Sequence, residues 1–165
     1  MLYGAPEGHD ARVLSAKARE LMAEDRVLMH VCLDESRMMA LAASLKFFAE
    51  DLAIIRLPAW DCLPYDRVSP HNDVVAQRVS ALSRLINWWD DQKRAPRILL
   101  TTVNAISQRT VPVDVLRQRR LVAQKGKRLE IGVMQDFFTQ NGYVRTDTVR
   151  EVGEYAIRGG IVDLY

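Results

Sequence analysis

Residues 27–57 read VLMHVCLDESRMMALAASLKFFAEDLAIIRL, and this stretch predicts the fold of the N-terminal part of the chain. Apolar, β-rich runs occupy residues 27–33 and 53–57. Between them, apolar residues recur at helical spacing after a start near Asp34 or Ser36. Both runs are continuous rather than alternating, which is typical of parallel strands covered by helices on both faces. The stretch therefore predicts a strand–helix–strand unit with a right-handed crossover.

The same alternation continues on either side of this stretch. A first helix is expected after Asp10, a candidate N-cap, and residues 1–3 are expected to end a strand before it. Downstream, the sequence predicts a helix introduced by Asn72-Asp73, a strand over residues 98–102 and a short helix over residues 104–109. We therefore expect an α/β domain with a parallel sheet over residues 1–111.

The character of the sequence changes near Pro112. The remaining residues predict a strand within 116–125, a helix over 130–140, and short strands over 143–144, 154–158 and 161–164. The pair Asn141-Gly142 after the helix is a favourable C-cap. This pattern predicts a small α+β domain over residues 112–165. Because the chain stops straight after a predicted strand, we expect this domain to be truncated.

The composition argues against several classes of protein. A formal net charge of +2 disfavours a nucleic-acid-binding protein that works through a strong basic field. Cys32 and Cys62 form no CxxC pair and the histidines share no metal-ligand spacing, so no metal site is expected. No apolar run approaches the ~20 residues of a membrane helix, and the first residues lack the basic region of a signal peptide. We therefore expect a reduced, cytoplasmic protein without a membrane segment.

Residues 4–11 occupy the position of a phosphate-binding loop, after a short predicted strand and before a helix. That motif needs Gly, four residues, and then Gly-Lys-Ser/Thr. Gly4 matches its first glycine, whereas His9, Asp10 and Ala11 replace the second glycine, the lysine and the hydroxyl residue. Without the lysine and the hydroxyl, phosphate and Mg²⁺ lose their usual partners, and the Asp10 carboxylate repels phosphate. The loop is therefore predicted to be degenerate, with no catalytic residue and no cofactor. The alternatives are that some anion still binds there or that it is an ordinary strand–helix turn.

The most distinctive stretch is WDCLPYDRVSPH, residues 60–71. It resembles the transcription-repair coupling factors (the Mfd family), in which a Trp-x-x-Leu-Pro-Tyr-Asp-x-x-Ser-Pro-His segment leads into a helix. The resemblance continues in DVVAQRVSAL (73–82), TTVNA (101–105), KGKRL (125–129) and GEYAIRGGIVDLY (153–165). It covers essentially the whole chain and rests on several separated motifs.

In that family, such a segment is an N-terminal module similar to the excinuclease protein UvrB. The resemblance implies a helicase-like, nucleotide-free first domain and a small second domain that docks on the excinuclease protein UvrA in nucleotide excision repair. Full-length members are ATP-dependent DNA translocases that displace stalled RNA polymerase, and they contact polymerase and DNA through other domains. This chain is therefore expected to be a non-catalytic docking module. An active P-loop ATPase or helicase fragment and a damaged-DNA-binding fragment are the alternatives.

The resemblance also implies which residues bind the partner. Arg158, in the Tyr-Ala-Ile-Arg-Gly segment, is the first candidate, followed by Arg145 and Arg150. Tyr155 and Tyr165 are candidate aromatic anchors. Arginine suits such a site because its planar fork pairs bidentately with carboxylates and because it is enriched among interface hot spots.

Three further interpretations come from the residues themselves. Trp60 and Tyr65 are expected to pack over the domain and hold their loop, the alternative being stacking on nucleic-acid bases. The pair Ser69-Pro70 is expected to provide the N-cap and first residue of the following helix. The basic run from Arg117 to Arg128 is either a solvated face or a weak, salt-sensitive contact with DNA or an acidic partner.

Overall fold

The computed structural model describes residues 6, 8–63, 65–90 and 95–165. A parallel sheet is formed by β1 (Leu28–Cys32), β2 (Ala53–Leu57) and β3 (Arg97–Thr102), in the order β1-β3-β2. The prediction of an α/β fold with parallel strands is thereby confirmed. The strand expected over residues 1–3 lies outside the described residues.

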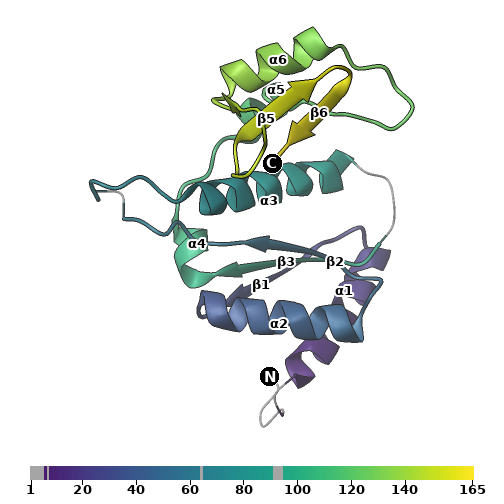
Figure 1. Ribbon diagram of the computed structural model, residues 1–165. Coiled ribbons are helices and arrows are strands. Elements are labelled where there is room, and N and C mark those ends of the chain that lie inside the picture. Colours follow the sequence, from purple (N-terminus) through teal and green to yellow (C-terminus); the bar gives the residue numbers. More distant parts are fainter. Residues whose placement is uncertain (1–5, 7, 64, 91–94) are drawn as a thin grey trace.

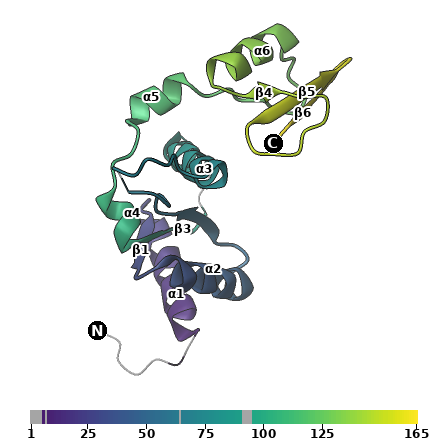
Figure 2. The same cartoon turned by 60° about the vertical axis from the view of Figure 1, so that its left-hand side comes forward.

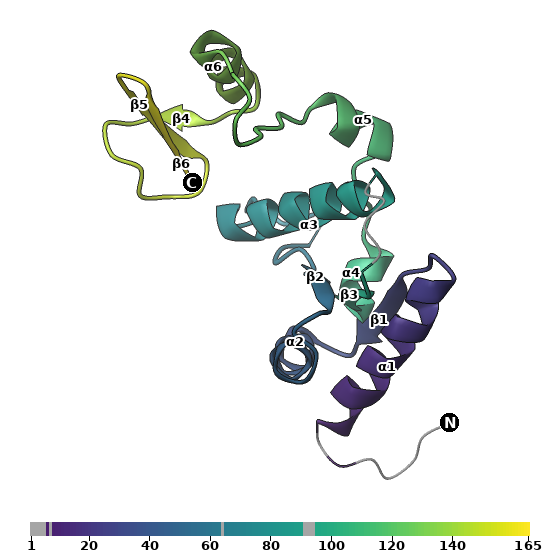
Figure 3. The same ribbon diagram turned by 90° about the vertical axis from the view of Figure 1, so that its right-hand side faces the viewer.

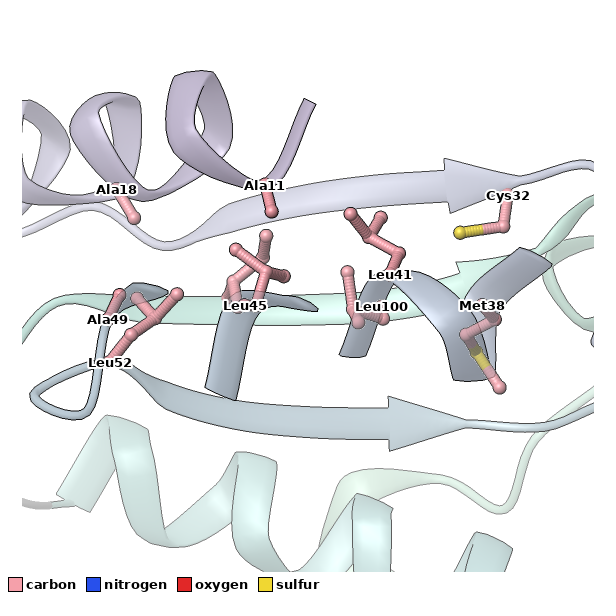
Figure 4. Packing of buried hydrophobic residues seen from close by; sticks show 10 residues of the cluster. Ala11, Ala18, Cys32, Met38, Leu41, Leu45, Ala49, Leu52 and Leu100 are labelled. Carbon is pink, nitrogen blue, oxygen red and sulfur yellow. The ribbon is translucent and has the colours of Figure 1, made fainter. Parts of the chain in front are cut away.

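Helices cover both faces of this sheet (Figure 1). On one face lie α1 (His9–Ala23) and α2 (Glu35–Phe48), and on the other lies α3 (Asn72–Asp90). The larger core cluster fills the space between α1, α2 and the sheet (Figure 4), and its members are Ala11, Ala18, Cys32, Met38, Leu41, Leu45, Ala49, Leu52, Ile98 and Leu100. Leu99, between the last two, faces α3 instead, as the alternation of strand side chains requires.

The helix starts follow local signals to different degrees. The Asp34 carboxylate accepts a hydrogen bond from the backbone N–H of Arg37 at 2.7 Å, which confirms the predicted start of α2. The prediction for Ser69-Pro70 is wrong, because α3 begins at Asn72. The carbonyl of His71 accepts hydrogen bonds from the N–H groups of Val74 and Val75, so His71 rather than Ser69 opens the helix.

A short helix, α4 (Val103–Ser107), follows β3, as predicted. The strand expected within residues 116–125 is wrong. Instead α5 (Val113–Gln118) forms, and the described residues 119–130 contain no strand. The helix is favoured there because Pro112 precedes it and Asp114 lies in its first turn. Its later residues also bond to α3, since Arg117 pairs with Asp90 at 2.7 Å.

The C-terminal elements agree with the sequence. They are α6 (Ile131–Gln140), β4 (Val144–Arg145), β5 (Glu154–Arg158) and β6 (Ile161–Leu164). Gly142 follows α6 with a φ of 77°, the left-handed conformation that glycine adopts without strain. The strands form a second sheet in the order β4-β5-β6, in which β4–β5 is parallel and β5–β6 antiparallel.

Below, α1–α4 with β1–β3 are called the parallel-sheet unit, and α6 with β4–β6 the mixed-sheet unit. In Figures 1, 2 and 3, α3 lies between the parallel sheet and the mixed-sheet unit, and α5 lies on the path that connects the two. The predicted boundary between residues 111 and 112 falls between α4 and α5. That the two units are separate domains stays a prediction.

Candidate functional site

Of the loop before α1 the structure describes Pro6 and Gly8, so Gly4 lies outside the described residues. Gly8 is the N-cap, with a left-handed φ of 84°, and His9 and Asp10 are the first residues of the helix. The prediction that Asp10 is the N-cap is therefore wrong. Its carboxylate instead accepts hydrogen bonds from the backbone N–H of Ala11 at 2.8 Å and from Nη2 of Arg37 at 2.7 Å.

Arg37 is a residue at this loop that no sequence motif indicated. It lies in the first turn of α2, 27 positions from Asp10, and its ion pair neutralises the carboxylate at the start of α1. An arginine in that turn looks like ordinary surface charge, so no local pattern points to the pair. Ala11 is 0% exposed and packs into the larger core cluster. A hydroxyl in its place would point into apolar side chains.

Two titratable groups of β1 lie close to this ion pair. Burial lowers the pKa of His30, with Asp10 opposing the shift and Arg37 adding to it. Burial also raises the pKa of the Cys32 thiol, against the charge of Arg37. His30 is therefore held neutral and Cys32 protonated, so neither presents a charge that would attract phosphate.

The loop after β2 contains the aromatic residues of the distinctive stretch. The Trp60 ring lies over the guanidinium of Arg78, 4.4 Å from its Cζ, so the prediction that Trp60 packs on the domain agrees with the structure. Tyr65 is 96% exposed, so the same prediction for Tyr65 is wrong. Asp66 turns the loop back by accepting the backbone N–H of Leu63 at 2.7 Å, which leaves the Tyr65 ring in solvent.

A cavity of about 1080 Å³ opens between this loop and α4. Its lining includes Trp60, Asp61, Cys62 and Tyr65 from the loop, and Asn104, Ser107, Gln108 and Arg109 from α4 and the residues after it. The cavity lies beyond the carboxyl ends of β2 and β3, where open parallel sheets bind ligands. No sequence motif assigned a ligand to it.

In the mixed-sheet unit, the structure separates the candidate partner-binding residues. Tyr155 is 5% exposed, and its ring lies 4.6 Å from that of Phe138 on α6. It is thus a core residue, and its assignment as an exposed anchor is corrected. Arg158, Arg145 and Arg150 are exposed. Tyr165 is exposed as well.

Arg158 lies at the end of β5, and its Nη2 donates to the Asp163 carboxylate on β6 at 2.6 Å. Arg145 on β4 is paired in register with Tyr155 on β5, and Tyr155 lies three positions before Arg158 on that strand. Because strand side chains alternate between faces, Arg145 and Arg158 project from opposite faces of the sheet. The candidate arginines therefore do not form one flat patch.

The residues of the basic run point in different directions. Arg117 and Arg120 are turned toward the end of α3, where they bond to Asp90 and Asn87. The lysines Lys125 and Lys127 are exposed in the turn around Gly126. Two of the arginines therefore connect the parts of the chain, and fewer charges remain for a contact with DNA.

Metal-ligating clusters and membrane-spanning helices would each indicate a different kind of site. No cluster of three or more His, Cys, Asp or Glu residues that could hold a metal ion occurs within residues 6, 8–63, 65–90 and 95–165. None of the helices in the described part of the chain combines the length and apolar character needed to cross a bilayer.

The fold and these surfaces define a class of protein: an α/β chain with a parallel sheet, a small mixed sheet and exposed arginines on that second sheet. No family model matches the chain. It is 36% identical over 115 residues to the transcription-repair-coupling factor of Escherichia coli, a match that covers 70% of this chain and 10% of that protein. The Haemophilus influenzae factor is 37% identical over 66% of this chain and 9% of its own length.

The transcription-repair-coupling factor of Myxococcus xanthus is 31% identical over 99% of this chain and 13% of its own length. The chain belongs to the family of transcription-repair-coupling factors. It spans about a tenth of the length of the relatives it matches.

Proposed function

We propose that this chain is a non-catalytic docking module from the N-terminal part of a transcription-repair-coupling factor. In this proposal, its mixed-sheet unit binds the excinuclease protein UvrA and thereby recruits it to DNA damage at stalled RNA polymerase. The full-length protein would be an ATP-dependent DNA translocase whose other domains contact the polymerase and DNA. The parallel-sheet unit would be a helicase-like domain that resembles UvrB and has lost its phosphate-binding loop.

The observation that carries the proposal is the position of Arg158. It stands exposed at the end of β5, and among the described residues its guanidinium bonds only to Asp163, a side chain that is itself partly exposed. An exposed ion pair of this kind contributes little to folding, so the guanidinium can exchange Asp163 for a carboxylate of a partner at small cost. Arginine at the centre of an interface is a frequent hot spot.

The experiment is a calorimetric titration of UvrA with this chain. We expect binding, and we expect Arg158→Ala to weaken it by ~1–3 kcal/mol. Asp163→Asn is the matched control: it removes the same ion pair but keeps the arginine, so binding should be as tight as for the unchanged chain. If Arg158→Ala binds equally well and its circular dichroism is unchanged, Arg158 is not in the interface.

The sheet geometry gives a second, sharper test. Since Arg145 and Arg158 project from opposite faces, a partner that meets both has to reach around the β4 edge of the sheet. The two side chains then have separate contacts. The effects of Arg145→Ala and Arg158→Ala on affinity should therefore add within ~0.5 kcal/mol. A strongly non-additive double variant would place the two arginines at one shared contact.

The non-catalytic part of the proposal rests on the start of α1. The carboxylate of Asp10 stands where a phosphate-binding lysine is required, and Arg37 is already paired with it. Ala11 packs in the core rather than facing a metal ion. Equilibrium dialysis with Mg-ATP should therefore show no saturable binding, and micromolar affinity would support the ATPase alternative instead.

A further inference from the structure

Arg78 on α3 is a buried charge without a counter-charge. It is 1% exposed, and no carboxylate of the described residues lies within ion-pair distance of it. Its Nη1 donates to the carbonyl of Pro58 and, at 3.4 Å, to Oε1 of Gln108. A guanidinium does not lose its proton in a protein, so its burial has to be compensated by partners.

The remaining donors of this side chain are unpaired. Nε and Nη2 of Arg78 are both buried and have no hydrogen-bond partner among the described residues. These two nitrogens lie side by side on one edge of the guanidinium. That edge binds the two oxygens of a carboxylate or a phosphate with parallel hydrogen bonds. The bonded part of Arg78 thus fixes its position, while the edge suited to an oxyanion has no acceptor within the described chain.

The cavity between the loop and α4 is lined by residues that contact Arg78, although Arg78 itself does not line it. Trp60 and Gln108, the two residues that contact Arg78 through ring and amide, also line the cavity. Its lining also includes the polar groups of Asn104, Ser107 and Arg109.

The acidic residues of the cavity are already engaged. Asp66 accepts the N–H of Leu63 at 2.7 Å, and Asp61 accepts the N–H of His71 at 3.2 Å. Arg109 offsets one of these two charges in the lining. The carboxylates therefore stabilise the loop, and they do not neutralise Arg78.

We propose that the Nε–Nη2 edge of Arg78 binds the oxyanion of a small molecule, a phosphate or a carboxylate, that enters through this cavity beneath Trp60. This site is separate from the start of α1 and from the arginines of the mixed sheet, so it stands independently of the docking function. Because neither nitrogen reaches solvent, the Trp60 side chain has to move off the guanidinium for the anion to enter. Leu63, Tyr65 and Val68 in the same loop are exposed, so they do not oppose this movement, while the buried Pro58 stays bonded to Arg78.

The test follows two NMR signals of the ¹⁵N-labelled chain, the Nε–H of Arg78 and the indole N–H of Trp60. Sodium phosphate and sodium acetate are titrated separately, each against sodium chloride of equal ionic strength. We expect saturable shifts of both signals with phosphate, acetate or both, and the difference between the two arms identifies the preferred oxyanion. Unchanged signals in both arms, or saturable shifts confined to other arginines, would overturn the proposal.

Three variants make the assignment specific. Arg78→Lys keeps the charge but removes the two-donor edge, and it should weaken the anion-dependent shift of Trp60 by about tenfold or more. Arg67→Lys, a matched change at an exposed arginine of the same loop, should alter affinity less than about twofold. If Arg78→Lys does not fold, Trp60→Phe serves in its place. It keeps Arg78 and an aromatic cover, so its Arg78 signal must still respond to the anion, and a silent signal would refute the site.

Discussion

Replacing Phe138 with alanine tests whether the mixed-sheet unit has a core of its own. Phe138 is 1% exposed, and its ring lies 4.6 Å from that of Tyr155 and 5.3 Å from that of Tyr143. Among the described residues after 111, the other buried ones are Tyr155 and Ala156. One ring is therefore the centre of this small core.

The expected loss of stability is large relative to the total free energy of unfolding of a unit of this size. Truncating a buried phenylalanine to alanine costs ~3–5 kcal/mol. The mixed-sheet unit runs from Ile131 to Leu164, so with ~34 residues it has a free energy of unfolding of roughly 1.7–5 kcal/mol. Phe138→Ala should therefore leave the mixed-sheet unit largely or wholly unfolded. The parallel-sheet unit should stay folded, because Phe138 belongs to neither of its core clusters.

Hydrogen exchange read by mass spectrometry separates these outcomes. Peptides covering α6 and β5 should lose their protection, while peptides covering β1, β2 and β3 keep it. Phe47→Ala is the control, because that ring is 80% exposed and its loss should change neither region. If protection falls equally in both units, they unfold as one, and the boundary predicted at residue 112 is wrong. If protection is unchanged everywhere, Phe138 does not stabilise the unit.

Three further predictions concern charge and thiols. Burial lowers the pKa of His30, so the stability that the neutral imidazole contributes is complete above the unfolded value of 6.5 and is lost as pH falls through the lower folded value. Between pH 5 and 8, the free energy of unfolding from urea melts should therefore change less with pH in His30→Gln than in the unchanged chain. Equal pH dependence in the two would contradict this. Asp90→Asn, which weakens the pair with Arg117, should lower the free energy of unfolding by less than ~1 kcal/mol in denaturant titrations, because both side chains are nearly half exposed; a loss above ~2 kcal/mol would show a stronger coupling. Iodoacetamide should modify Cys62 in the folded chain and Cys32 only after denaturation, because Cys32 is 2% exposed and its pKa is raised by burial; equal rates would disprove the burial.

The parallel strands could be predicted because a strand buried on both faces has a continuous run of apolar residues. The expected strand over residues 53–57 coincides with β2, and the expected strand over 98–102 lies within β3. The Asp34 cap was also readable, since it depends on a side chain and a backbone N–H three residues apart. Each of these features is determined by neighbours in the sequence.

The predictions are wrong where a residue distant in the sequence determines the local structure or the burial of a side chain. The helix α5 bonds to α3 through Arg117 and Asp90, 27 positions apart, and no local pattern shows that pair. Tyr155 is buried because Phe138 on another element covers it, whereas Tyr65 has no such cover. The sequence does indicate that Arg78 is unusual, because this charged residue lies within the apolar stripe of a helix. A charge in that position nevertheless resembles one at the exposed edge of the stripe, so its burial is easily missed.

The contacts between α5 and α3 have a consequence for how the chain responds to cleavage. Contacts such as Arg117 with Asp90 and Arg120 with Asn87 contribute at most about 1 kcal/mol each. On their own, these two contacts would give two free fragments a dissociation constant well above ~1 mM. The short covalent tether between α4 and α5 supplies a local concentration in that same range, and it therefore holds the mixed-sheet unit in place. A single proteolytic nick there would let the unit diffuse away with its arginines.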